Sequence, residues 1–209
     1  YGLKPFKDAG AEVWAHRGSL DYLTNGEAER RRAQRALDLS PWIDAETPLV
    51  HADRWLDGDE AFTLGGIRFE VQHFGPAHSP EDLVVVVPRE GVVFSGDILF
   101  TGRVPFVGQA DSKAWLARIG RLIDLEPKLM VTGHGEVSRE PAKDLALTRD
   151  YLTFLRAEMG RAVADFVPFE EAYRRTDWSR YASLPAFGAA NRVNAYGTYL
   201  LLERESLGK

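Results

Sequence analysis

Apolar and polar residues alternate with a period of two in the first half of the chain, which predicts strands there. The alternation is clearest over residues 67–73. Residues 83–87 read Leu-Val-Val-Val-Val, the continuous apolar run expected of a strand that is covered on both faces. Pro88-Arg89-Glu90-Gly91 then leads into another apolar run, residues 92–95, so these two strands are expected to form a hairpin.

Helical spacing of apolar residues dominates the second half. Asp111 and Ser112 offer an N-cap for a helix that continues through Ile123. A short strand is expected at residues 129–131, and a long helix at 141–164. The tail, from Phe166 to Glu205, reads as two helical pieces separated by Leu184-Pro185.

The N-terminal part is less regular. A short helical turn is expected at residues 3–8 and a short strand at 12–15. Residues 19–40 are rich in charge and poor in aromatics, which indicates a surface helical segment whose charged side is solvated. We find no internal repeat, low-complexity tract or linker, so the simplest expectation is one domain with a helical C-terminal extension.

Composition narrows the class of protein. The 209 residues are 44% apolar and 27% charged, typical of a globular domain that builds its own core. A net charge of −5 argues against a nucleic-acid partner, and no apolar run is long enough to cross a bilayer. The absence of cysteine excludes disulfides, thiolate metal sites and cysteine nucleophiles.

Three side chains that could bind metal occupy similar places along the chain. His78 precedes the apolar strand at 83–87, Asp97 follows the strand that ends at Ser95, and His134 follows the strand at 129–131. Each is expected in a turn bounded by glycine or proline, with its base fixed by a strand and its tip accessible. Taken singly, each could equally be a turn residue satisfied by local hydrogen bonds.

The chemistry of this trio suits a metal centre. Imidazole and carboxylate bind Zn²⁺, Fe or Mn, so the ligand types alone do not name the metal. A carboxylate such as Asp97 can give one oxygen to each of two cations. Such a pair lowers the pKa of a shared water and polarises the bond that the resulting hydroxide attacks.

The segments around these residues resemble the metallo-β-lactamase superfamily. GPAHSPEDLVVVV, GVVFSGDILF and VTGHGEV occur in that family's order and at similar separations. The resemblance implies that His78 binds a first metal, that Asp97 bridges two metals and is catalytic, and that His134 binds the second. It implies an α+β fold, an αββα sandwich. Residues 1–140 would form this domain and residues 141–209 its helical C-terminal part.

One part of the family pattern is missing. The His-x-His-x-Asp-His cluster of the superfamily does not occur, and Tyr1-Gly2-Leu3 resembles the stretch that directly follows it. We therefore expect a sandwich incomplete at its N-terminus, with metal bound weakly. The remaining ligands would come from an upstream segment or a second chain. The resemblance implies two zinc ions in the complete site, with iron or manganese as alternatives.

The bridging aspartate also bears on function. The β-lactamases of this family commonly place cysteine or another residue at the position of Asp97, whereas glyoxalase II-like and lactonase-like members use aspartate. The resemblance thus implies a hydrolase that uses a metal-bound hydroxide on a small ester, thioester or lactone. The alternatives are an iron-dependent redox member of the fold, or a non-catalytic fragment that needs another segment to complete its site.

A second resemblance extends beyond this core. GRVPFVG at residues 102–108 and AANRVNAY at residues 189–196 are similar to the quinoprotein relay system zinc metallohydrolases. This resemblance favours a periplasmic location, with the cytoplasm as the alternative. Phe106 follows the Asp97 segment and either borders the substrate or packs in a surface loop. Asn191, Arg192, Asn194 and Tyr196 are expected to serve helix packing, with a substrate contact as the alternative.

Other polar residues near the trio admit two interpretations. Asp82, four residues after His78, either orients that ligand through a hydrogen bond or caps the turn. We expect structural or surface roles for the other histidines: His16 at a strand end, His51 in a polar stretch, and His73 half-buried with one hydrogen bond.

Overall fold

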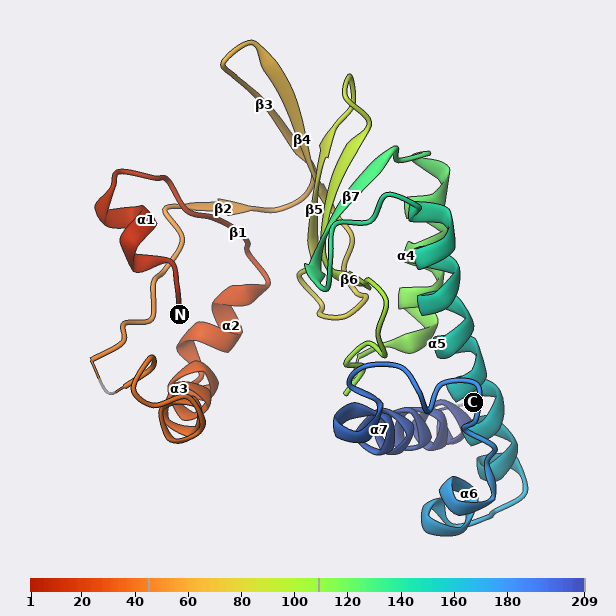
Figure 1. Ribbon diagram of the computed structural model, residues 1–209. Coiled ribbons are helices and arrows are strands. Elements are labelled where there is room, and N and C mark those ends of the chain that lie inside the picture. The colour runs from red at the N-terminus through yellow and green to blue at the C-terminus, as the bar shows by residue number, and fades with distance from the viewer. Residues whose placement is uncertain (45, 109, 209) are drawn as a thin grey trace. The chain divides into compact units, whose positions relative to one another are not determined.

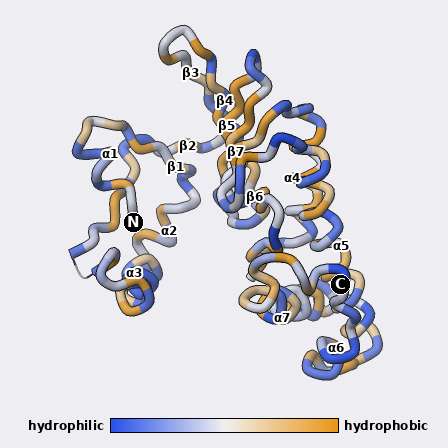
Figure 2. The backbone as a smooth tube through the Cα atoms, viewed as in Figure 1, coloured by the Kyte–Doolittle hydropathy of each residue, from blue (hydrophilic) through white to orange (hydrophobic). Residues whose placement is uncertain are grey.

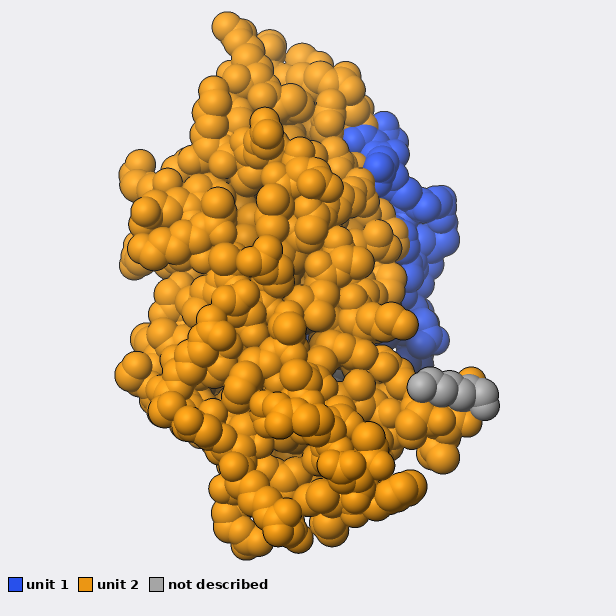
Figure 3. Space-filling model, turned by 90° about the vertical axis from the view of Figure 1, so that its right-hand side faces the viewer, with its two compact units in different colours: residues 1–60 blue, residues 61–209 orange. Residues whose placement is uncertain are grey.

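The computed structural model describes residues 1–44, 46–108 and 110–208. Two compact units divide the chain, Tyr1–Glu60 and Ala61–Lys209, and Figure 3 colours them separately. The assignment of residues 1–140 to one domain, with residues 141–209 as its helical C-terminal part, stays a prediction. The helices beyond residue 140 pack with the residues of the second unit.

The first unit is small and built around two short strands. It contains α1 (Lys4–Asp8), β1 (Trp14–His16), α2 (Ser19–Thr24), α3 (Glu27–Asp38) and β2 (Arg54–Leu56). The two strands pair in parallel. The Arg54 guanidinium carbon lies 4.3 Å from the centre of the Trp14 ring. As expected from its charge, α3 is a surface helix in which Ala28 is the buried residue.

The second unit contains a five-stranded mixed sheet, in the order β3-β4-β5-β6-β7 (Figure 1). These strands are β3 (Glu60–Leu64), β4 (Ile67–His73), β5 (Leu83–Val87), β6 (Val92–Phe100) and β7 (Leu129–His134). The pairs β4–β5 and β5–β6 are antiparallel, whereas β6 and β7 are parallel. Hydrophobic residues concentrate along these strands (Figure 2).

Four helices complete the second unit: α4 (Ser112–Asp124), α5 (Pro141–Ala164), α6 (Phe169–Arg175) and α7 (Phe187–Leu207). The Asp111 carboxylate caps α4, as expected, because its Oδ1 accepts from the amides of Lys113 and Ala114 at 3.1 and 2.9 Å. Helices α4 and α5 pack on β6, and α7 packs on α5. None of the helices in the described residues is long and apolar enough to cross a membrane.

The core lies between the sheet and these helices. It draws alternate residues from the strands and the apolar sides of α4 and α5, including Val84, Val86, Val93, Met130, Trp115, Ile119, Leu145 and Leu152. The alternation follows from the pleat, which turns successive side chains to opposite faces of a strand. The mixture of helices and a mixed sheet confirms the predicted α+β class.

The position of Leu152 in this core leads to a stability prediction. Leu152→Ala should lower the free energy of unfolding by about 2–5 kcal/mol, because Leu152 has 0% exposure and its truncation leaves a cavity. Urea unfolding followed by circular dichroism measures the change. Leu207→Ala is the matched control on a helix, since Leu207 is 83% exposed and should change stability by less than about 0.5 kcal/mol. Equal effects of the two substitutions would contradict the assignment of this core.

Candidate metal centre

Asp97 lies inside a strand and not in the turn that we expected after Ser95. Strand β6 continues to Phe100 because its parallel pairing with β7 extends to the pair Phe100–His134. The pairing shifts register on both sides of Gly96, whose φ of +53° suits a residue without a side chain. The prediction of a turn was wrong because a periodicity of two cannot reveal pairing that continues through a bulge.

The three predicted ligands come together in the fold. The Nε2 atom of His78 lies 3.6 Å from Oδ2 of Asp97, and the Nε2 atom of His134 lies 3.6 Å from Oδ1. The two imidazoles therefore approach different oxygens of one carboxylate. The His134 side chain is 51% exposed and the His78 side chain 21%, so the group opens to solvent.

These distances fit shared cations better than direct hydrogen bonds. A separation of 3.6 Å is longer than a normal N–H···O bond. Two ligands that each lie about 2.0–2.1 Å from one tetrahedral zinc ion are about 3.3–3.4 Å apart. Imidazole nitrogen and carboxylate oxygen are also suitable donors for such an ion. The spacing and the donor types therefore suit part of a metal site.

The site is nevertheless only partial. Within the described residues, no three His, Cys, Asp or Glu side chains form a group that could hold a metal ion. Each oxygen of Asp97 faces a single imidazole, so a cation beside either oxygen would receive two side-chain donors. Catalytic zinc sites generally use three protein ligands for each ion.

Two aromatic rings of the core, those of Phe100 and Trp115, lie against the two imidazoles. The Phe100 ring stacks on His134, with centroids 5.1 Å apart and an interplanar angle of 16°. Trp115 meets His78 edge to face at 5.4 Å and donates from Nε1 to the Ile98 carbonyl at 3.0 Å. Both rings are buried, so they restrict how the ligands rotate. Phe100 belongs to the segment GVVFSGDILF, and its place in that segment was the only sequence feature that could have indicated a role beside the site.

Glycines allow the two ligand strands to approach closely. A Cβ atom added at Gly133 would clash with Oδ1 of Asp97, and one added at Gly135 would clash with the Thr101 carbonyl. The Thr101 amide donates to the His134 carbonyl at 3.0 Å, which joins the end of β6 to the ligand. These glycines are therefore required by close approach of the backbone to the site.

The turn that carries His78 is held by Asp82. The Asp82 carboxylate accepts from the Ser79 amide at 2.8 Å and from the Ser79 hydroxyl at 2.7 Å. Of the two interpretations of Asp82, the structure therefore displays the turn cap. Nδ1 of His78 is buried without a hydrogen-bond partner among the described residues.

The remaining histidines lie outside the trio. His16 accepts a hydrogen bond from the Gly18 amide on its Nδ1, His51 is exposed, and Nε2 of half-buried His73 lies 3.1 Å from the Pro80 carbonyl. These are the structural and surface roles that we expected. Phe106 is 46% exposed in the segment that follows β6, and its contact with substrate stays a prediction.

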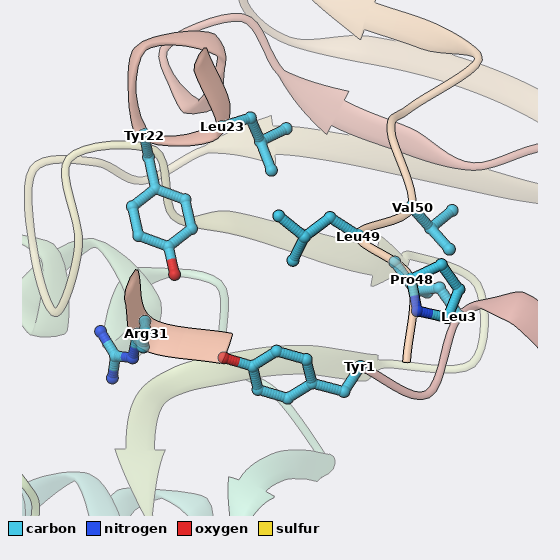
Figure 4. Close-up of a pocket in the computed structure, with 8 residues that line it drawn as sticks. All are labelled: Tyr1, Leu3, Tyr22, Leu23, Arg31, Pro48, Leu49 and Val50. Atoms are coloured by element: carbon cyan, nitrogen blue, oxygen red, sulfur yellow. The ribbon is translucent and has the colours of Figure 1, made fainter. Parts of the chain in front are cut away.

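A separate cavity of about 260 Å³ lies in the first unit (Figure 4). The Leu23 and Leu49 side chains face one another across it, and the Tyr1 hydroxyl extends toward Arg31. Its lining is mainly apolar and aromatic and includes no histidine or carboxylate.

Comparison with known proteins identifies the family. The family model described as the metallo-beta-lactamase superfamily matches residues 1–134. Solved structures with the fold include a metallo-beta-lactamase family protein from Thermus thermophilus, 20% identical, with a TM-score of 0.62 over all of this chain and 71% of that one. The chain has the architecture of the metallo-β-lactamase fold. It belongs to the metallo-beta-lactamase superfamily.

Curated relatives match about half of the chain. Hydroxyacylglutathione hydrolase GloC of Haemophilus influenzae is 34% identical over 96 residues, which are 46% of this chain and 41% of the relative. The probable metallo-hydrolase YqgX of Bacillus subtilis is 31% identical over 108 residues, 50% of this chain and 48% of the relative. The matched regions cover less than half the length of these relatives. The two relatives support the general class of hydrolase for this chain.

The contact at Gly133 yields a prediction for metal binding. Gly133→Ala should weaken zinc binding at least about tenfold, because the new methyl group must displace the Asp97 carboxylate. Titration with zinc against a competing chelator measures the affinity. Gly120→Ala is the control, since a Cβ at this position in α4 meets no atom within 4 Å. Unchanged zinc affinity in Gly133→Ala would show that Asp97 is not a ligand.

Proposed function

We propose that the protein is a metal-dependent hydrolase of a small ester, thioester or lactone. One observation carries the proposal: a single carboxylate, Asp97, meets a different imidazole at each of its two oxygens. That arrangement suits two cations bridged by one acid group, with His78 on one and His134 on the other. When bound, such a pair makes a water acidic enough to act as a nucleophile near neutral pH and polarises the substrate.

The protein's own residues would orient the reaction. The stacked Phe100 ring and the edge of Trp115 hold the two imidazoles toward Asp97, so the ligand positions exist before any cation binds. The exposed side of His134 leaves an approach for a substrate. Phe100 and Trp115 are buried, so the parts of the imidazoles that they cover are shielded from water.

The substrate class follows from the acid at the bridging position and from the relatives. Aspartate at this position is what glyoxalase II-like and lactonase-like members use. The relative from Haemophilus influenzae is named a hydroxyacylglutathione hydrolase. An acyl compound with a good leaving group therefore agrees with both arguments better than a β-lactam does.

We further propose that other donors complete the centre, from an upstream segment or from a second chain. The support is the count of two side-chain donors for each cation position among the described residues. Zinc in both positions is our proposal for the metal, and the periplasm is our proposal for the location. The proposed location rests only on the resemblance of residues 102–108 and 189–196.

Asp97 provides the direct test of hydrolysis. Asp97→Ala in the full-length protein should lower kcat/KM for a thioester such as acetyl-thiocholine by at least about a thousandfold, because both cation positions lose a ligand. Asp124→Ala, at an exposed carboxylate of α4, is the matched control and should leave turnover unchanged. Undiminished turnover in the Asp97 variant would eliminate the proposal.

Metal analysis separates hydrolysis from iron-dependent redox chemistry. The purified full-length protein should contain zinc, lose thioester hydrolysis when treated with a chelator, and recover it when zinc is restored. Elemental analysis and an oxygen electrode make both measurements on one preparation. Stoichiometric iron together with consumption of oxygen would instead support the redox alternative.

A further inference from the structure

A single buried side chain of the C-terminal helix holds the segment that follows the metal-ligand strand. The Oδ1 atom of Asn194 accepts from the Val107 amide at 2.7 Å and from the Gly108 amide at 3.3 Å. Its Nδ2 donates to the Pro105 carbonyl at 2.7 Å. Three backbone groups that no strand or helix satisfies are thus bound by one amide, which has no exposed surface.

The orientation of that amide is itself fixed. The Nδ2 atom of Asn194 also donates to the Tyr151 hydroxyl at 3.0 Å, and this hydroxyl donates to Oδ1 of Asn191 at 2.8 Å. Asn191 in turn donates to the Tyr173 hydroxyl at 3.1 Å. Burial raises the pKa of Tyr151, so its hydroxyl stays protonated and remains a donor. A network in which each polar group has its partner specifies one arrangement.

Residues 101–108 are bonded on one side to the strand of His134 and on the other to the segment that leads into α7. At its start, the Thr101 amide donates to the carbonyl of the ligand His134. Further on, the Val104 amide donates to the Pro185 carbonyl, two residues before α7 begins. Only a few residues separate Asn194's partners from Phe100, whose ring stacks on His134. Helix α7 and the ligand strand are therefore coupled through one short loop.

The side chain that this loop presents is apolar. Phe106 is 46% exposed, although Val104 and Val107 beside it are 1% and 2% exposed. A Cβ added at Gly108, whose φ is +54°, would lie 3.0 Å from the Phe106 ring, so the ring folds back over this glycine. The loop begins directly after Phe100, whose ring stacks on His134, and an exposed phenylalanine on such a loop is a suitable contact for an apolar part of a substrate.

We propose that Asn194 is a positioning residue for substrate recognition: it fixes residues 105–108 so that Phe106 forms an apolar wall beside the metal centre. The inference rests on the proposed hydrolase function and adds that the preferred substrate has an apolar acyl or leaving group. It also makes α7, nearly 100 residues from Asp97 in sequence, part of the substrate site and not only of the core.

The test compares three single variants of the zinc-loaded full-length protein: Phe106→Ala, Asn194→Leu and Tyr199→Phe. The last is the matched control on α7, because the Tyr199 hydroxyl donates to the Val167 carbonyl at 3.1 Å and not to the loop. The probes are the acetyl and octanoyl esters of p-nitrophenol. Hydrogen exchange at the Val107 and Gly108 amides reports on the loop independently of turnover.

We expect Asn194→Leu to speed exchange at both amides by at least about tenfold, because their acceptor is removed. Asn194→Leu and Phe106→Ala should each raise KM for the octanoyl ester about tenfold and change KM for the acetyl ester less than about twofold. Because both substitutions affect the same apolar wall, the double variant should raise KM for the octanoyl ester no more than either single variant does. Tyr199→Phe should change none of these values.

Several results would overturn the inference. It fails if the two amides stay protected in Asn194→Leu, or if both esters are affected equally. If Asn194→Leu does not fold, Phe106→Ala alone decides, because this exposed side chain can be removed without loss of the core. An unchanged KM for the octanoyl ester in Phe106→Ala would then refute the apolar wall. Absence of ester hydrolysis in the unsubstituted protein, with the amides protected as expected, would refute the proposed function and leave the loop clamp standing.

Discussion

The parallel pairing of β6 with β7 is the constraint on which the site depends. It carries Asp97 and His134 on neighbouring strands, and its register shifts around Gly96 turn the Asp97 carboxylate toward the imidazole. A regular ladder would alternate side chains between the two faces of the sheet. The register shifts therefore set the direction of the Asp97 side chain, and the absence of a side chain at Gly133 leaves space for the carboxylate. A bulge beside a functional site is a common device for directing a side chain.

Apolar packing and polar chemistry meet at the end of these strands. Phe100 and Trp115 belong to the core, yet each lies against a ligand imidazole. The same burial that stabilises the second unit thus limits the rotation of His78 and His134. A ligand held by packing loses less conformational freedom when it binds a cation, which favours binding. Stability and function are linked here through two shared aromatic rings.

The C-terminal helix is connected to the centre by hydrogen bonds as well as by packing. Asn191 and Asn194 are fully buried amides, and a buried amide without partners would be costly. Their partners are two tyrosine hydroxyls and the backbone of the loop after β6. Such a network gives the loop one conformation, whereas purely apolar packing would tolerate several. It explains why polar residues occupy the inner side of an otherwise apolar helix.

The sequence alone determined most of the elements and named the three candidate ligands. Strand alternation, the Asp111 cap and the helix over residues 141–164 depend on local periodicity, which a sequence displays directly. The order of the three segments around His78, Asp97 and His134 indicated the family. Only the tertiary structure decided that β6 runs on through Asp97, that Asp82 caps a turn, and that Asn194 binds the loop of Phe106. These features depend on contacts between residues far apart in the chain, and no local pattern encodes which partners will meet.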